Sequence, residues 1–124
     1  MLLRTGVVAL IALAVMPSGA TAAGCYYLGL RFHVAQNDSV STTGVSTGGG
    51  ACVTRFWAGG TNHFTSATIA ARPNHGTLTE MGALHFRYKP SSGFKGADRY
   101  SLRVCGTEPA GSGCATLTYN ITVR

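Results

Sequence analysis

The sequence predicts an all-β protein: a sandwich of two sheets with about seven strands, held together by disulfides. Apolar and polar residues alternate with a period of two in several segments, which is typical of strands with one buried face. Turn-forming residues, among them many of the 17 glycines, separate these segments. Charged residues make up 11% of the chain, less than half of the roughly 25% usual in globular domains, which excludes a coiled coil and a charge-rich disordered tail.

The first 22 residues have the pattern of a secretory signal peptide. Arg4 supplies a positive charge, an apolar run follows over residues 6–16, Pro17 ends any helix, and the small residues at 20–22 form an A-x-A cleavage site. The apolar run is about half as long as the roughly 20 residues that a membrane-spanning helix needs. We therefore expect residues 1–22 to be removed. The exported mature chain would be one domain over residues 23–124, without a transmembrane helix and located in the periplasm or outside the cell.

Residues 22–25 also resemble a bacterial lipobox, in which small residues precede a cysteine that is lipidated. Alanine stands where such motifs usually have leucine. All four cysteines lie in the mature region, an even number that suits disulfides in an oxidising compartment. Lipidation of Cys25 would leave one of the other three without a partner. Soluble export is therefore the main prediction, and a lipoprotein anchored through Cys25 is the alternative.

Seven segments are predicted as strands. The first covers residues 26–34, and its alternation places one set of residues in the core: Tyr26, Leu28, Leu30, Phe32 and Val34. Residues 39–50 are rich in Ser, Thr and Gly, so we expect irregular or edge structure with a flexible loop there. Proline and glycine predict a turn at residues 72–76. The other predicted strands are residues 51–57, 64–71, 77–80, 84–89, 100–104 and 115–123.

Two motifs stand close together in the second half of the chain. Residues 73–78 have the pattern P-x-H-G-x-L, and residues 86–104 have the pattern F-x-Y-x-P-x-x-G-F-x-G-x-D-x-Y-x-L-x-V. Together they resemble bacterial immunoglobulin-like and cadherin-like repeat domains. The resemblance implies an immunoglobulin-like β-sandwich used for adhesion, spacing or ligand display outside the cell, without catalysis. This chain differs from such repeats in having one copy of the motif, four cysteines and no acidic calcium-binding loops.

Four residues of the second motif are predicted to be structural. Gly93 and Gly96 permit turns that a Cβ would strain, and Asp98 can accept hydrogen bonds from turn N–H groups. Tyr100 is expected to begin the next strand, with its ring in the core and its hydroxyl bonded to a backbone group, as in the tyrosine corner of sandwich domains. A metal-ligand role for Asp98 is the less favoured alternative, and no metal site is predicted.

The four cysteines are predicted to be disulfide-bonded. Cys105 and Cys114 bracket eight residues between two strong strands, so a hairpin would bring both thiols to its base. Cys25 and Cys52 then pair by elimination and join the first two strands. Four cysteines allow three connectivities, so this pairing is a preference rather than a deduction. A zinc site is the competing use, but no C-x-x-C or clustered histidine spacing supports it.

Positive charge is the remaining functional signal. The ten Lys and Arg residues become nine once Arg4 leaves with the signal peptide, and against four Asp and Glu they give about +5. Four outward-facing side chains on two predicted strands are candidates for binding anions: Arg87, Lys89, Arg99 and Arg103. If the two strands lie in opposite sheets, this patch is split, and ordinary solubilising charge is the simpler interpretation.

Residues for catalysis are scarce. The four acidic residues and four histidines are scattered, and no nucleophile elbow is predicted. A Ser-His-Asp triad stays open as an alternative, because the members of a triad converge in space rather than in sequence. The predicted function is therefore non-catalytic: an exported bacterial immunoglobulin-like module with a binding or structural role in the cell envelope or outside the cell, without cofactors. One alternative is a basic-surface binder of anionic polysaccharide or lipid headgroups. Another is a small envelope enzyme or an enzyme inhibitor that uses residues 106–113 as an inhibitory finger. Candidate partners are envelope polysaccharide, anionic lipid or another envelope protein, and export argues against intracellular nucleic acid.

Overall fold

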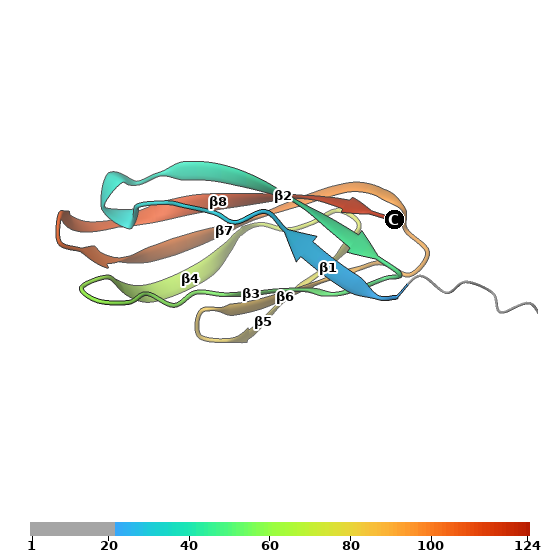
Figure 1. The fold of residues 1–124 in the computed structure, drawn as a ribbon, viewed down its shortest axis with the longest axis horizontal. Helices are drawn as coiled ribbons and strands as arrows, with labels where there is room; N and C mark the ends of the chain where they lie inside the picture. The colour runs from blue at the N-terminus through green and yellow to red at the C-terminus, as the bar shows by residue number, and fades with distance from the viewer. Residues whose placement is uncertain (1–21) are drawn as a thin grey trace, which may run out of the picture.

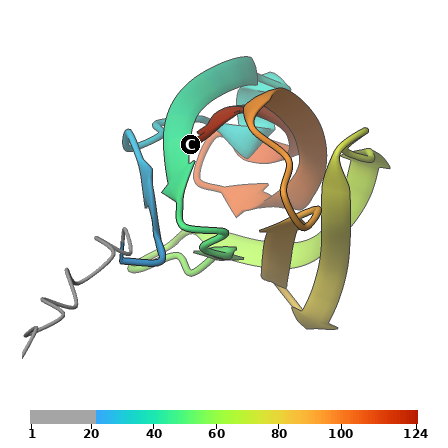
Figure 2. The same cartoon turned by 90° about the vertical axis from the view of Figure 1, so that its right-hand side faces the viewer.

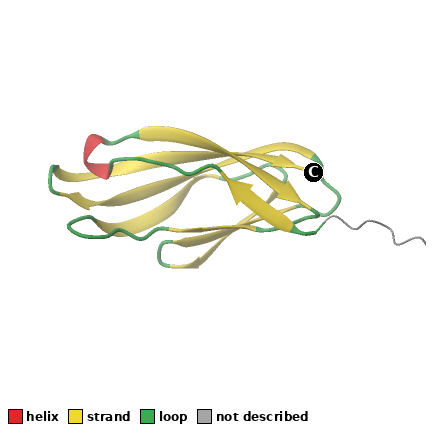
Figure 3. Cartoon of the chain, viewed as in Figure 1, coloured by secondary structure: helices red, strands yellow, loops and turns green. Residues whose placement is uncertain are grey.

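The computed structural model describes residues 22–124, which form eight β-strands and one short 3-10 helix (Figures 1 and 3). The strands are β1 (Gly24–Tyr27), β2 (Ser39–Thr47), β3 (Cys52–Arg55), β4 (His63–Ala71), β5 (Gly76–Gly82), β6 (His85–Pro90), β7 (Gly96–Glu108) and β8 (Gly111–Val123), and the helix η1 is Val34–Gln36. The predicted all-β class is confirmed, with eight strands over these residues where about seven are expected. The predicted signal peptide, residues 1–22, lies outside the described residues except for its last residue.

The strands of residues 22–124 form two sheets that pack face to face. The larger sheet has the order β1-β2-β8-β7-β4, and the smaller has the order β3-β6-β5. Neighbouring strands are antiparallel except β2 and β8, which run parallel with Ser39 opposite Thr116 and Ser46 opposite Val123. In a view along the long axis of the molecule, the larger sheet curves over the smaller one (Figure 2).

The core lies between the sheets and comes from alternate residues of the long strands. In β6, β7 and β8 the predicted alternation is confirmed, because the apolar positions are buried and the polar positions between them face outward. Four tyrosines pack together there, and we call them the tyrosine column: Tyr27, Tyr88, Tyr100 and Tyr119. The ring centroids lie 5.2 Å apart for Tyr88 and Tyr100 and 4.9 Å apart for Tyr100 and Tyr119, and Tyr27 meets the Tyr119 ring edge-on at 5.4 Å.

The first predicted strand is shorter than expected. β1 ends at Tyr27, and residues 28–33 are not strand. Tyr26 and Leu28, expected in the core, are 67% and 55% exposed, whereas Tyr27 packs against the core. Within β1 the alternation therefore has the opposite phase to the expected one, and the chain leaves β2 after the backbone N–H of Leu28 donates to the carbonyl oxygen of Thr43 at 3.0 Å, which ends the strand.

The prediction of irregular or edge structure for residues 39–50 is wrong for most of that stretch. Ser39–Thr47 form β2, a nine-residue strand between β1 and β8. Its inward positions Thr42, Gly44 and Ser46 are buried. The hydroxyl of Thr42 donates to the carbonyl oxygen of Leu28 at 2.7 Å, and that of Ser46 donates to the carbonyl oxygen of Gly50 at 2.6 Å. Small, hydrogen-bonded side chains therefore replace the apolar residues that usually reveal a strand.

Both predicted disulfides are present. Cys105 and Cys114 are directly opposite residues of β7 and β8. Cys25 and Cys52 join β1 of the larger sheet to β3 of the smaller one. Two disulfides indicate an oxidising, exported environment. The sulfur of Cys25 is used in its disulfide, so the lipid thioether of the lipoprotein alternative has no free thiol in this structure.

The hairpin predicted around residues 106–113 is present, and its turn is tighter than expected. β7 and β8 stay paired as far as Glu108 opposite Gly111, which leaves a turn of two residues. Gly106 is buried because the chain passes close to it: a Cβ there would lie 2.2 Å from the carbonyl oxygen of His63. The segment is thus a continuation of the paired strands with an exposed tip at residues 109–112, and its role as an inhibitory finger stays a prediction. Over the described part of the chain, no helix is long and apolar enough to cross a membrane.

Candidate functional site: an aromatic cleft between the two sheets

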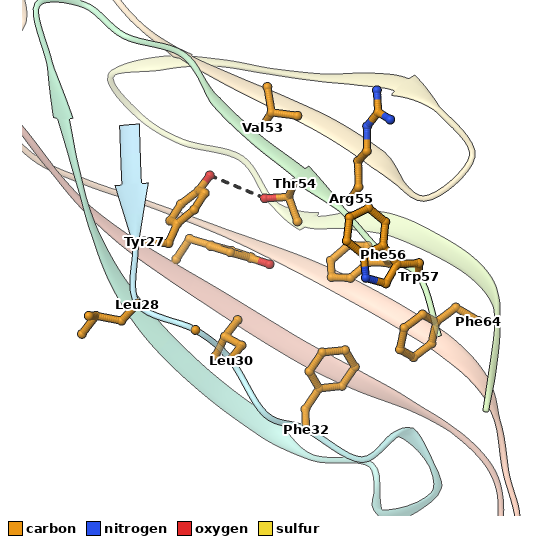
Figure 4. Close-up of a pocket in the computed structure, with 12 residues that line it drawn as sticks. Tyr27, Leu28, Leu30, Phe32, Val53, Thr54, Arg55, Phe56, Trp57 and Phe64 are labelled. Atoms are coloured by element: carbon orange, nitrogen blue, oxygen red, sulfur yellow. Dashed lines mark hydrogen bonds between the residues drawn. The ribbon is translucent and has the colours of Figure 1, made fainter. Parts of the chain in front are cut away.

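A cleft of about 350 Å³ opens at the side of the sandwich where β1 and β3 lie (Figure 4). One wall is the segment that follows β1, with Leu30 and Phe32. The other wall is β3 with the residues just beyond it, from Val53 to Trp57. We call this the aromatic cleft and define it by the residues used below: Tyr27, Leu30, Phe32, Thr54, Phe56 and Trp57.

The cleft exists because its two walls diverge. At one end the disulfide holds the Cα atoms of Cys25 and Cys52 5.1 Å apart. Beyond it, β3 continues along β6, while residues 28–33 leave β2 without forming a strand. Figure 4 shows Leu30 and Phe32 pointing toward the wall formed by β3, whereas Leu28 points away from it. The sandwich is therefore closed near the disulfide and open toward Phe32 and Trp57.

Aromatic rings fill the open end. Phe32 and Phe64 stack with ring centroids 5.6 Å apart, and Phe56 meets them edge-on at 6.4 Å and 6.2 Å. Trp57 follows at the rim and is 80% exposed. A tryptophan buries a large apolar area when it is covered. This end of the cleft favours apolar or aromatic groups.

Neutral hydroxyl groups lie at the closed end. The hydroxyl of Tyr27 is 2.8 Å from that of Tyr100, and Thr54 donates to Tyr27 at 3.5 Å. Burial raises the pKa of Tyr27, against the lowering effect of its hydrogen bonds with Thr54 and Tyr100. Burial also raises the pKa of Tyr100 and of Tyr119. These phenols stay protonated at neutral pH, so they can donate and accept hydrogen bonds without adding charge.

Arg55 is the charged side chain of the cleft, and it lies at the rim. It is exposed, and its Nε donates to Nε2 of His85 at 3.4 Å. The cleft therefore combines an aromatic surface with a few polar groups, which is the usual composition of a ligand site.

The four predicted anion-binding residues are not brought together. Arg87 and Lys89 lie on β6 of the smaller sheet, and Arg99 and Arg103 lie on β7 of the larger sheet. Each alternates with buried neighbours and is exposed, so the two pairs face outward on opposite sides of the sandwich. The expected patch is therefore split into two halves.

A second, polar cavity of about 480 Å³ involves one of these residues. Arg99 lines it together with Arg72, Asn74, His75 and Asn120. Within residues 22–124 the one contact between a basic and an acidic side chain joins His33 to Glu108, so neither guanidinium of this cavity is paired with a carboxylate. Arg72 instead donates from Nη1 to the carbonyl oxygen of Leu78 at 3.4 Å.

Asp98 also lines the polar cavity, but its carboxylate is engaged in holding the fold. It is 6% exposed and accepts hydrogen bonds from the N–H groups of Asn74 and His75, both at 3.1 Å, and of Arg99 at 2.9 Å. The hydroxyl of Tyr88 donates to it at 2.7 Å. Burial and the adjacent carboxylate raise the pKa of Tyr88. Asp98 thus joins the turn at residues 72–76 to β6 and β7.

The other residues predicted to be structural are placed in the same region. Gly93 and Gly96 have φ angles of 77° and 136°, which favour glycine. The ring of Tyr100 is buried, as expected, but two details of its prediction are wrong. Tyr100 lies within β7 rather than at its start, and its hydroxyl contacts the hydroxyl of Tyr27 rather than a backbone group. The tyrosine column supplies that partner because Tyr27 enters the core from β1.

The described residues contain neither a metal-binding cluster nor a serine in the setting of a nucleophile elbow. Within residues 22–124, no group of three or more His, Cys, Asp or Glu is placed to hold a metal ion. Residues 44–48 do have the G-x-S-x-G pattern of a nucleophile elbow. However, Ser46 is fully buried inside β2, donates to Gly50, and is followed by a turn and β3 rather than by a helix. It therefore lacks the strand-turn-helix setting that exposes such a serine.

No pattern described above marks the aromatic cleft as a whole. Phe56 and Trp57 fall in a segment predicted as a strand, residues 51–57, and adjacent strand residues point to opposite faces. Two large aromatic residues in succession therefore require that one of them face away from the core. That signal alone could have marked Trp57 as an exposed contact residue.

The chain was compared with protein-family models, curated proteins and solved structures, and nothing matches it.

Proposed function

We propose that this chain is an exported, non-catalytic immunoglobulin-like module that binds a ligand in the aromatic cleft. The single observation that carries the proposal is the cleft itself. Its volume of about 350 Å³ is within the range of about 300–1,000 Å³ typical of ligand pockets, and an 80% exposed Trp57 stands at its rim. A non-catalytic role is favoured because the polar groups inside it are neutral hydroxyls of raised pKa rather than a nucleophile with a base.

The immunoglobulin-like assignment is supported by strand order. In immunoglobulin domains strands B, E and D face strands C, F and G. Here β3, β6 and β5 face β4, β7 and β8, in matching chain order, and β2 lies alongside β8. The disulfide between the sheets differs, because it joins β1 to β3 rather than the second strand to the sixth. Together with the signal-peptide pattern, the two disulfides favour a place in the bacterial envelope or outside the cell.

The proposal can be tested with anilinonaphthalene sulfonate, a dye with an aromatic body and an anionic sulfonate group, at a salt concentration high enough to screen general attraction to the basic chain. Trp57 is the only tryptophan of the chain, so its fluorescence reports on the cleft directly. The oxidised protein should bind the dye saturably, with quenching of Trp57 emission. Leu30→Asn should weaken this binding about tenfold, since about 1.4 kcal/mol of lost apolar contact corresponds to that factor.

The control is Met81→Asn. Met81 is also an exposed apolar side chain, but it lies on β5 and is not among the residues that line the cleft, so its substitution should change dye binding less than about twofold. Absence of saturable dye binding, or equal effects of the two substitutions, would refute the proposed role of the cleft.

A second candidate function, anion binding, is favoured by the polar cavity. Arg72 and Arg99 line it without an ion-pair partner among the described residues. The double variant Arg72→Gln/Arg99→Gln should elute from heparin at lower salt than the wild type. The control Arg87→Gln/Lys89→Gln removes the same charge from the opposite sheet. Equal shifts for both variants would mean general electrostatic attraction rather than a site.

A further inference from the structure

One wall of the aromatic cleft has backbone groups without partners. β3 is an edge strand, and among residues 22–124 it pairs with β6 alone. The N–H of Phe56 donates to the carbonyl oxygen of Leu84, on the β6 side, at 2.9 Å. Backbone groups alternate in direction along a strand, so those of Thr54 face β6, whereas those of Val53 and Arg55 face away from it. Val53 and Arg55 both line the cleft.

These bare groups restrict what can fill the cleft. Covering the N–H and C=O groups of Val53 and Arg55 with a purely apolar molecule would leave buried polar groups unsatisfied, which is costly. An extended peptide satisfies them, because it presents N–H and C=O groups at the same spacing. Exposed strand edges without protection are templates for such pairing.

The side chains around this edge suit a strand as well. Alternate residues of an added strand point to the same face, so every second side chain would enter the cleft. There it would meet Leu30 and Phe32 from one wall and Phe56 from the other. The remaining side chains would face solvent. Apolar residues at alternate positions are therefore the expected pattern of the occupant.

From these observations we infer that the occupant of the aromatic cleft is an extended peptide segment of a partner protein, which pairs with β3 as an added strand. The inference rests on the proposed binding role of the cleft. It adds that the partner's backbone, and not only its side chains, is recognised.

The probe is a capped seven-residue peptide of alternating valine and threonine, added to the oxidised full chain. Amide hydrogen exchange followed by NMR should show new protection at Val53 and Arg55, with little change at Cys52 and Thr54, whose amides already face β6. If the peptide adds protection at all four amides, or at none of them, strand addition at this edge would be contradicted.

Two methylated forms of the peptide provide the matched control. One carries N-methyl groups on its valines and the other on its threonines, so each form blocks one edge of the extended peptide. One form should bind about tenfold more weakly than the parent, and the other should stay within about threefold of it, because only one edge faces β3. Equal binding of both forms to the parent's level would overturn the inference.

On the protein, Val53→Pro removes the N–H that faces the cleft, while Val53→Ala keeps it. Proline is tolerated in edge strands at such positions, and a thermal unfolding scan checks that the variant folds. Peptide affinity should fall about tenfold further in the proline variant than in the alanine variant.

The outcomes separate this inference from the proposed function. Dye binding without peptide binding leaves the cleft as a site but overturns the added strand. Loss of both refutes the proposed function too. Protection of Val53 and Arg55 that increases with protein concentration alone would identify a second copy of the chain as the occupant and would also overturn the inference.

Discussion

Replacement of Asp98 by alanine removes one acceptor group from four donors. The Asp98 carboxylate is buried, and it joins the turn at residues 72–76, β6 and β7 through the hydrogen bonds described above. The hydroxyl of Tyr88 is the most affected donor, because Tyr88 is 0% exposed and has no route to water.

The magnitude follows from these contacts. A hydrogen bond to a charged group contributes about 1.5–3 kcal/mol, and a buried donor left without a partner costs about 1–3 kcal/mol. The hydrogen bonds from Asn74 and His75 are only partly buried, so water can replace part of what their N–H groups lose, and they add less. We expect Asp98→Ala to lower the free energy of unfolding by about 3–5 kcal/mol, a large part of the about 5–15 kcal/mol typical of a domain.

Urea unfolding with both disulfides intact measures this loss. Asp38→Ala is the matched control: Asp38 accepts the N–H of His33 at 2.8 Å in an exposed position, so its loss should cost about 1 kcal/mol or less. Adding Tyr88→Phe to Asp98→Ala removes the unpaired hydroxyl and should restore about 1–2 kcal/mol. Equal effects of Asp98→Ala and Asp38→Ala, or no recovery in the double variant, would refute the reasoning.

Three further predictions concern the core and its disulfides. The free energy of unfolding should fall as the pH rises above about 10, because the unfolded chain loses tyrosine protons that the folded chain keeps. Three buried tyrosines would lower it by about 4 kcal/mol per pH unit once all three are ionised in the unfolded chain. Urea unfolding that is unchanged between about pH 9 and 11 would contradict this prediction. Gly76→Ala should lower the free energy of unfolding by about 1–3 kcal/mol, because the added Cβ would lie 2.5 Å from the Tyr88 ring. The control Gly59→Ala, where a Cβ would have nothing within 4 Å, should lower it by less than about 1 kcal/mol in the same thermal scan. Similar losses in the two variants would exclude a steric cause. Replacing Cys25 and Cys52 by alanine should destabilise the protein about 1 kcal/mol more than replacing Cys105 and Cys114, because the first bridge spans 27 residues and the second 9. The reverse order in urea unfolding would show that the entropy of loop closure does not dominate the stabilisation by these disulfides.

The strands with apolar inner faces could be predicted from the sequence, and β2 could not. The reason lies in the bulk of the tyrosine column. A Cβ on Gly44 would lie 2.8 Å from the Tyr27 ring, so the space that a Val or Leu of β2 would occupy is already filled. The alternation of apolar residues therefore reports the volume available to a strand as well as its conformation, and it fails where a neighbour is large.

The first segment shows a different limit. Residues 26–34 alternate as strictly as β8 does, yet only the first two of them belong to a strand. Leu30 and Phe32 share a side because the chain there is extended and lines the aromatic cleft. Period two thus identifies an extended chain with two different sides, but it does not tell whether the backbone is paired.

The candidate sites depend on information that local patterns lack. The outward direction of Arg87 and Arg99 follows from alternation, whereas their separation follows from the sheet to which each strand belongs. The walls of the aromatic cleft come from residues 28–32 and 53–57, and Phe64 and Tyr119 complete it. These residues come together only when the sheets pack, so the spacing of residues along the sequence does not predict the cleft.

The parallel pairing of β2 with β8 has a consequence for the order of assembly. Ser39 finds its neighbour at Thr116, close to the end of the chain. In a chain that emerges N-terminus first, β1 and β2 can form their hairpin early, and Cys25 can already meet Cys52. The backbone groups on the other edge of β2, a strand without charged residues, stay unpaired until β8 is available to pair with them. Closing so long a loop is slow, so the interval before β8 arrives is when this protein is most exposed to misassociation.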